Sequence, residues 1–135
     1  MAKKNELYPK DTPQVIRDFL NYLSSVRGRS DATIKEYFLD LRTFFRFIKQ
    51  YKGIVQDDVK FSNISINDID IDFIRSITLS DMYEFMIFVK NERPTYHKSN
   101  NTTYGNNSST RSRKTASIRS FYKYLVSRNL IETNI

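Results

Sequence analysis

Residues 30–53 read SDATIKEYFLDLRTFFRFIKQYKG, and this stretch decides the fold class. Its apolar side chains recur every three to four residues, as they do on one face of an α-helix. Ser30 precedes the pattern as an N-cap, Asp31 follows where its charge complements the helix dipole, and Gly53 is the candidate C-cap. The apolar face consists of Ile34, Tyr37, Phe38, Leu41, Phe44, Phe45 and Ile48. The stretch predicts a long amphipathic helix.

A second helix is predicted before it. Thr12 is the expected N-cap, Pro13 the first helical residue, and Gly28 the stop. Its expected apolar face is Val15, Ile16, Phe19, Leu20, Leu23 and Val26.

Two more helices are predicted toward the C-terminus. Thr78 opens one as its N-cap, with Asp81 three residues later as a variant of the capping box, and this helix ends before Pro94. Its expected face is Leu79, Met82, Tyr83, Met86 and Val89. The last helix runs from about residue 110 to residue 128, and its expected buried face is Ile118, Phe121, Tyr122 and Leu125. Leu130 and Ile131 are expected to fold back onto the core.

The connections between these helices are less regular. In residues 54–77, isoleucines alternate with aspartates as in a strand, but no second strand is in sight to pair with it. We therefore expect an extended connection with a short helical turn near residues 72–75. Residues 95–110 are rich in Asn, Ser and Thr and predict a long flexible loop.

The whole chain is therefore predicted to be all-α, a bundle of four to five helices. Its 135 residues suit one domain, and only three Gly and three Pro leave little material for the turns of a β-sandwich or barrel. We expect residues 1–11 to be a flexible arm and residues 12–135 to form the domain.

The charge is high and unevenly distributed. The chain carries 22 basic and 15 acidic residues, a net charge of +7. Residues 1–53 contribute +5, residues 54–92 contribute −5, and residues 93–135 contribute +7. Such segregation favours a polyanionic partner. Ordinary drift in composition is the alternative.

Several classes of function are excluded or disfavoured. The chain has no cysteine and a single histidine, His97, so no Cys- or His-based metal site is expected, and no cofactor is. Asp68, Asp70 and Asp72 do not fit an EF-hand, because Phe73 and Leu79 occupy the positions that need Gly and Glu. No phosphate loop or nucleophile–base motif is present. No apolar run approaches the roughly 20 residues of a membrane span, and no secretory signal is seen, so a cytoplasmic protein is expected.

One basic stripe is predicted on the helix at residues 30–53. Lys35, Arg42, Arg46 and Lys49 fall within about 60° of one another, on a face that we expect to lie opposite Phe38 and Leu41, and they span about 21 Å. Such a stripe could follow DNA phosphates. The alternative is an ordinary solvated face, since acidic residues lie nearby.

The last helix carries a second basic cluster. Arg111, Arg113 and Lys114 are expected in its first turn, where the helix dipole disfavours cations. A phosphate bound there by the free N–H groups and these side chains would explain the placement, with Ser109 and Thr110 adding hydroxyls. The alternative is that the cations simply point into water.

Two stretches resemble one family. Residues 29–44, RSDATIKEYFLDLRTF, resemble the opening helices of the core-binding domain of tyrosine recombinases, the phage-integrase and Xer-like group. Residues 110–125, TRSRKTASIRSFYKYL, look like the final helix of that domain, and residues 129–134 resemble the segment that leads into the catalytic domain. The likeness spans about residues 12–135.

This resemblance implies a SAM-like helical domain that positions a duplex half-site for DNA integration and recombination. Its partners would be double-stranded DNA, other recombinase protomers, and a catalytic domain following Ile135, so the chain itself would be non-catalytic. The departures are the acidic insertion at residues 54–77, the loop at residues 95–110, and Thr115 where an apolar residue is usual. The expected DNA-binding residues are Thr33, Lys35, Arg42, Arg46, Thr110, Arg111, Arg113 and Lys114. A helical protein–protein module and an autonomous DNA-binding regulator are the rival interpretations.

Overall fold

The computed structural model describes residues 7–91, 95–96, 102–103 and 108–132. The described part contains five α-helices, one short 3-10 helix (η1) and two strands of two residues each. The predicted all-α class is therefore confirmed. The chain divides into two compact units, Met1–Ile74 and Arg75–Ile135, which are taken in turn below.

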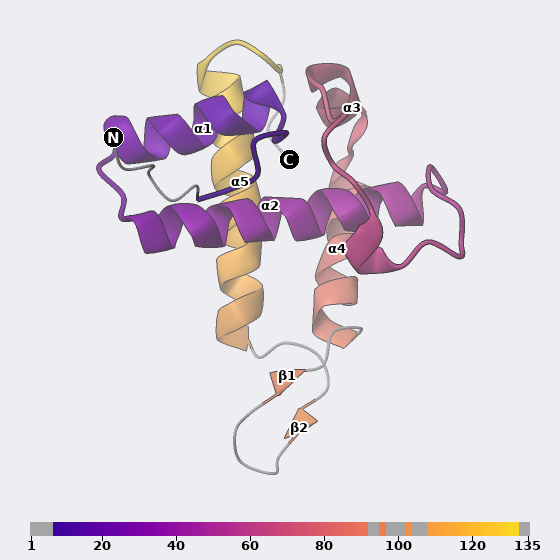
Figure 1. Cartoon of the computed structure of the whole chain (residues 1–135). Helices are drawn as coiled ribbons and strands as arrows, with labels where there is room; N and C mark the ends of the chain where they lie inside the picture. Colours follow the sequence, from indigo (N-terminus) through magenta and orange to yellow (C-terminus); the bar gives the residue numbers. More distant parts are fainter. Residues whose placement is uncertain (1–6, 92–94, 97–101, 104–107, 133–135) are drawn as a thin grey trace. The chain divides into compact units, whose positions relative to one another are not determined.

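The first unit is built on two helices, α1 (Gln14–Ser25) and α2 (Asp31–Tyr51). They lie side by side and run in opposite directions (Figure 1). Gly28 links them in the left-handed region with φ +64°, which a residue with a Cβ rarely adopts. Both helices bury apolar side chains, which are Ile16, Phe19, Leu20 and Leu23 of α1 and Ile34, Phe38, Leu41, Phe44, Phe45 and Ile48 of α2.

The start of α2 matches the prediction, whereas its end and the start of α1 do not. Ser30 Oγ accepts a hydrogen bond from the backbone N–H of Thr33 at 3.2 Å. The C-cap of α2 is Lys52, one residue before the expected Gly53, which follows it with φ +70°. The N-cap of α1 is Pro13, without a side-chain bond. Thr12 instead donates its hydroxyl proton to the carbonyl of Pro9 at 2.6 Å, because residues 9–12 form a turn. The expected N-cap role of Thr12 was wrong.

After α2 the chain forms η1 (Phe61–Asn63), an extended segment, and α3 (Ile71–Ser76). The expected extended connection and helical turn are confirmed, while η1 was not foreseen. Ile64, Ile66 and Ile69 of the extended segment are buried, which explains the alternation in the sequence without any strand.

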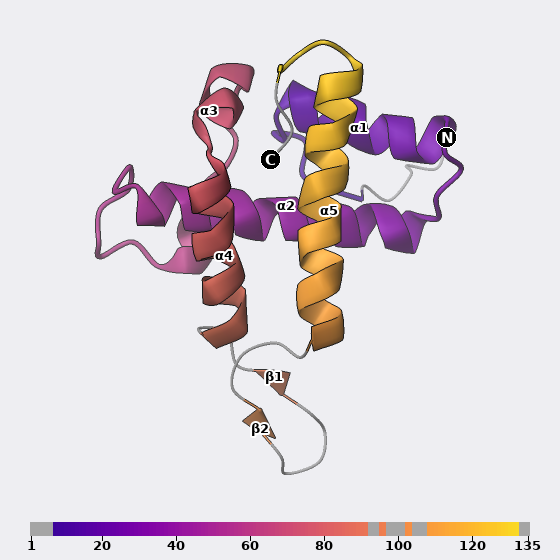
Figure 2. The same cartoon turned by 180° about the vertical axis from the view of Figure 1, so that it is seen from behind.

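The second unit contains α4 (Leu79–Asn91) and α5 (Ser108–Ser127), which lie side by side and run in opposite directions (Figure 2). The predicted capping box is confirmed: Thr78 Oγ1 accepts from the N–H of Asp81 at 3.2 Å, and Asp81 Oδ2 accepts from the N–H of Thr78 at 2.9 Å. Between the two helices, β1 (Thr95–Tyr96) and β2 (Thr102–Thr103) pair antiparallel. Residues 108–110, expected in the loop, already belong to α5, and residues 97–101 and 104–107 of the predicted loop lie outside the described residues.

The buried face of α5 was predicted correctly, whereas that of α4 was not. On α5, Ile118, Phe121, Tyr122 and Leu125 are buried as expected. On α4 the face is rotated: Met82, Phe85 and Val89 are buried, whereas Leu79, Tyr83 and Met86 are exposed. The reason is that α4 carries apolar side chains on nearly its whole circumference, so their spacing does not select one face.

The C-terminal segment is attached to α3. Arg75 donates from Nη2 to the carbonyl of Leu130 at 2.8 Å, and Ile131 is buried. Leu130 is exposed, so of the two residues expected to fold back only Ile131 does so.

Candidate nucleic-acid interface

The N-terminus of α2 holds the first predicted contact, Thr33. Its backbone N–H is bonded to Ser30 Oγ, and its own Oγ1 accepts the Ser30 hydroxyl proton at 3.1 Å. Thr33 is therefore part of the helix cap. Because its hydroxyl acts as the acceptor in that bond, it retains its proton for a further acceptor such as a phosphate oxygen.

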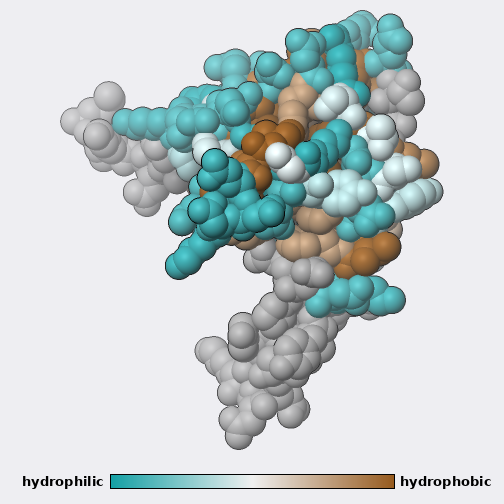
Figure 3. All heavy atoms as spheres, turned by 90° about the vertical axis from the view of Figure 1, so that its right-hand side faces the viewer, coloured by the Kyte–Doolittle hydropathy of each residue, from teal (hydrophilic) through white to brown (hydrophobic). Residues whose placement is uncertain are grey.

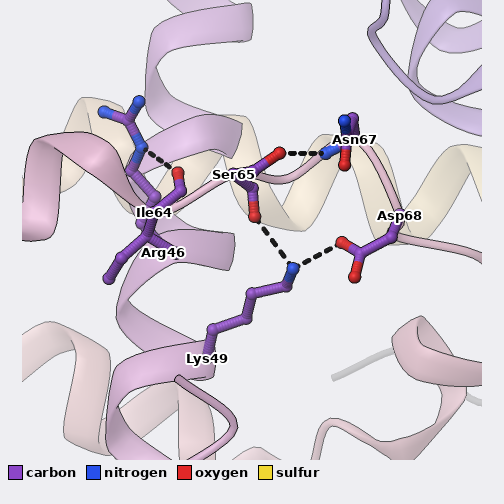
Figure 4. Close-up of polar contacts among 6 residues, drawn as sticks. All are labelled: Arg46, Lys49, Ile64, Ser65, Asn67 and Asp68. Carbon is purple, nitrogen blue, oxygen red and sulfur yellow. Dashed lines mark hydrogen bonds and ion pairs between the residues drawn. The ribbon is translucent and has the colours of Figure 1, made fainter. Parts of the chain in front are cut away.

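The basic stripe on α2 divides into two halves, and its C-terminal half is occupied within the fold. Lys49 is buried, donates from Nζ to the carbonyl of Ser65 at 2.8 Å, and forms an ion pair with Asp68. Arg46 donates from Nε to the carbonyl of Ile64 at 2.9 Å (Figure 4). The expectation of one exposed basic stripe opposite Phe38 and Leu41 was therefore wrong, because Lys49 is buried and the Arg42 guanidinium lies over the Phe38 ring.

The function of Arg46 and Lys49 in the structure is to hold the extended segment after η1. They supply donors to backbone carbonyls that would otherwise be left without partners beside α2. The backbone N–H of Asn67 donates to Ser65 Oγ at 3.2 Å and tightens the same turn. Contact between Arg46 and DNA remains a prediction, with at least one of its donors already in use.

Lys35 and Arg42 form the N-terminal half of the stripe. Lys35 is exposed. The guanidinium carbon of half-buried Arg42 lies 5.6 Å from the centre of the Phe38 ring, a cation–π contact that fixes its direction. In the described part of the chain, Arg42 Nε is buried and makes no hydrogen bond. Two turns of α2 therefore present one exposed cation, Lys35, and one half-buried cation, Arg42.

A basic hollow adjoins this half of the stripe and was not predicted from the sequence. It has a volume of about 800 Å³, and its lining includes Lys10, Arg17 and Lys35. Arg17 lies 5.5 Å from the centre of the Tyr8 ring and donates from Nη1 to the carbonyl of Lys10 at 3.0 Å. Tyr8 in turn donates its hydroxyl proton to Asn21 Oδ1 at 3.1 Å. These contacts involve residues 8–10 of the predicted arm, while the domain division at residue 12 remains a prediction.

The second cluster lies on α5. This helix begins at Ser108, two residues before the expected start, so Arg111, Arg113 and Lys114 are its fourth, sixth and seventh residues. The three cations therefore extend beyond the first turn of α5. The helix dipole disfavours cations only within that first turn, so it applies fully to Arg111 and less to Arg113 and Lys114. Arg113 is exposed, and Arg111 and Lys114 are half-buried. The side chain of Thr110 lies outside the described residues.

The charge of α5 is of one sign throughout. The helix carries five cations and no acid, and the five are Arg111, Arg113, Lys114, Arg119 and Lys123. Its potential is therefore positive along some five turns. The cluster on α2 belongs to the first unit and this one to the second.

The buried hydroxyl of Tyr122 is a poor nucleophile. Burial raises the pKa of Tyr122 well above its ordinary value, and the charge of Asp81 raises it further. The phenol therefore stays neutral and belongs to the core of the second unit. Within the described residues, no three metal-ligating side chains come together. None of the described helices is long and apolar enough to cross a membrane.

Comparisons with known proteins agree on one family. The family model described as "Phage integrase, N-terminal SAM-like domain" matches residues 16–129. A tyrosine recombinase XerC from Caldanaerobacter subterraneus subsp. tengcongensis is 47% identical over 113 residues, which cover 84% of this chain and 29% of the relative. A tyrosine recombinase XerC from Herpetosiphon aurantiacus is 31% identical over 121 residues, covering 90% of this chain and 30% of the relative. The chain thus spans less than a third of the length of these relatives. No solved structure matches it.

Proposed function

Because the chain belongs to the phage integrase N-terminal SAM-like family of tyrosine recombinases, we propose that it binds duplex DNA and holds a half-site for integration and recombination. The observation that carries the proposal is α5, with its five cations and no acid. Lysine and arginine side chains on one helix neutralise successive phosphates and release their counterions.

The residues proposed to contact DNA differ in what they offer. Arg113 and Lys114 supply charge on α5, and Lys35 supplies it on α2. Arg42, oriented by Phe38, presents a guanidinium with little freedom left to lose on binding. Thr33 offers its hydroxyl proton at the helix cap. Arg111, Thr110 and Arg46 complete the proposed set, with Arg46 the weakest because it also holds residue 64.

The proposed chemistry of the whole protein lies outside this chain. The domain positions DNA, and the catalytic domain expected after Ile135 would cut and rejoin it, together with other protomers on the same DNA. Such a protein would act in the cytoplasm, where the bacterial chromosome is accessible. The chain itself is proposed to be non-catalytic.

Replacing Arg113 and Lys114 with Gln tests the proposal. Duplex affinity should fall by about 1–3 kcal/mol if either side chain reads a base edge and by less if both contact only phosphates. The measurement is the fluorescence anisotropy of a labelled duplex. The matched control replaces Arg27 and Lys60 with Gln, which removes the same charge from two exposed positions of the first unit.

The two variants separate a specific site from bulk charge. An equal loss of affinity in both would indicate that only the net charge matters, and unchanged affinity in the Arg113→Gln, Lys114→Gln protein would contradict the assignment. If the chain binds no duplex under any condition, the result would favour the rival interpretation, a helical protein–protein module.

A further inference from the structure

An exposed apolar stripe runs along α4. It consists of Leu79, Tyr83, Met86 and Ile87, whose exposed fractions are 48%, 56%, 42% and 54%. Their spacing of i, i+4, i+7 and i+8 places them on one side of the helix. This α4 stripe gathers four of the large apolar side chains that the described residues leave exposed, and such a concentration marks an interaction surface. Figure 3 shows one face of the molecule, on which hydrophobic residues, in brown, lie exposed among hydrophilic residues, in teal.

The stripe borders a groove between α4 and α5. The groove has a volume of about 580 Å³ and belongs wholly to the second unit. Met86 and Ile87 line its α4 side, and Ala116 adds an apolar contact from α5. Two antiparallel helices that lie side by side leave a furrow into which the ridge of a third helix fits.

The rim of the groove is cationic. Lys90 lies at the end of α4, and Arg111 and Arg119 lie two turns apart on α5. In the described part of the chain, none of the three has an ion-pair partner, and no acidic residue lines the groove. The groove therefore combines an apolar wall at Met86 and Ile87 with a rim whose charged side chains are all positive.

We propose that the groove between α4 and α5 binds an amphipathic α-helix of a protein partner, with an apolar ridge against the α4 stripe and acidic side chains against Lys90 and Arg119, the two groove cations that the proposed DNA contacts do not include. Apolar anchors at helical spacing are the usual way in which a helix is held in a groove. The cations select acidic partners and speed the encounter.

Other occupants fit the surface less well. A second copy presenting the same face would bring a second set of cations and no acid from the groove lining, and like charges across an interface are costly. A duplex would satisfy the cations but leave Tyr83, Met86 and Ile87 without apolar contacts, since its backbone is charged. An anionic membrane surface suits a convex amphipathic helix better than a groove between two helices.

A designed peptide provides the test. It is a labelled, helix-stabilised peptide of about four turns, with Leu at i, i+4, i+7 and i+11 and Glu along one flank. Two control peptides carry Lys in place of Glu, or the same residues in scrambled order. The 135-residue chain should bind the acidic peptide at least about tenfold more tightly than either control.

Variants of the chain connect the binding to the groove. Replacing Tyr83 and Ile87 with Gln changes no charge and leaves the buried face of α4 intact, and it should weaken peptide binding at least about tenfold. The matched control replaces Val26 and Ile54 with Gln. These two side chains are similarly exposed but lie in the first unit, so this variant should bind the acidic peptide as tightly as the unaltered chain. Arg119→Glu should remove the preference for the acidic peptide over the Lys peptide.

Each other outcome overturns the proposal. Equal binding of all three peptides, or full affinity in the Tyr83→Gln, Ile87→Gln protein, would show that the groove is not the site. Displacement of the peptide by a DNA duplex, with duplex affinity also lost in that variant, would assign the surface to nucleic acid. Binding to vesicles containing phosphatidylglycerol that is lost in the same variant would assign it to membranes. Since the variant keeps every cation, unchanged duplex affinity keeps this test separate from the proposed DNA-binding function.

Discussion

At the scale of single residues, Lys49 shows how the fold uses a charge that the sequence assigns to the surface. Its ammonium group is buried, while its partner Asp68 is largely exposed. Burying an ammonium is costly unless it is both paired and hydrogen-bonded, and here Asp68 and the Ser65 carbonyl do both. The basic stripe on α2 is therefore partly a structural device. Helical periodicity could not reveal this, because the partners lie 16 and 19 residues further along the chain.

Tyr122 makes a second prediction at this scale. Because burial raises its pKa above the ordinary value of 10.0, the folded chain retains a proton that the unfolded chain loses at high pH. The stabilisation is fully present below pH 10 and is lost as the pH rises above it, by about 1.4 kcal/mol per pH unit from this group. Urea unfolding measured between pH 8 and pH 11 should show this fall.

Replacing Tyr122 with Phe supplies the control. The variant lacks the ionisable group, so its stability should decline less steeply with pH over the same range. An identical decline in both proteins would mean that lysines and the other tyrosines account for the whole effect.

At the scale of elements, the accuracy of the sequence predictions follows from how local the signals are. The prediction for α2 succeeded because its cap, apolar face and terminal glycine all lie within residues 30–53. For α4 the capping box was predicted correctly, because its two residues lie only three positions apart. The buried face was not, because Phe85 competes with Tyr83 and only the tertiary packing decides between them. Of the candidate site, the cations on α5 were predictable from composition. The groove beside them was not, because it needs the packing of two helices.

The capping box of α4 predicts a measurable contribution to stability. Thr78→Ala removes the hydroxyl that accepts from the N–H of Asp81 and should lower the free energy of unfolding by about 1 kcal/mol. Thr78→Ser keeps an acceptor in place and should lose much less. Urea titrations give the free energy of unfolding of both variants, and an unchanged m-value shows that only stability differs. Equal stability of the Ala and Ser proteins would contradict the assigned cap.

At the scale of the whole molecule, the account separates DNA binding from DNA cleavage. The proposed function assigns the catalytic residues to a separate domain, and within this chain Tyr122 is buried and its raised pKa keeps the phenol neutral. We therefore expect the 135-residue chain to leave supercoiled plasmid unrelaxed, as judged by the distribution of topoisomers on agarose gels. Relaxation by a nuclease-free preparation would show that the chain contains a catalytic site of its own.

The most direct test of the central claim is the salt dependence of duplex affinity. If Lys35, Arg42, Arg113 and Lys114 each neutralise one phosphate, the logarithm of the binding constant should fall with the logarithm of salt concentration at a slope of about −3.6. In the Arg113→Gln, Lys114→Gln protein the slope should shrink to about −1.8. A titration that is flat from low to physiological salt, or a slope that is the same in both proteins, would contradict the account.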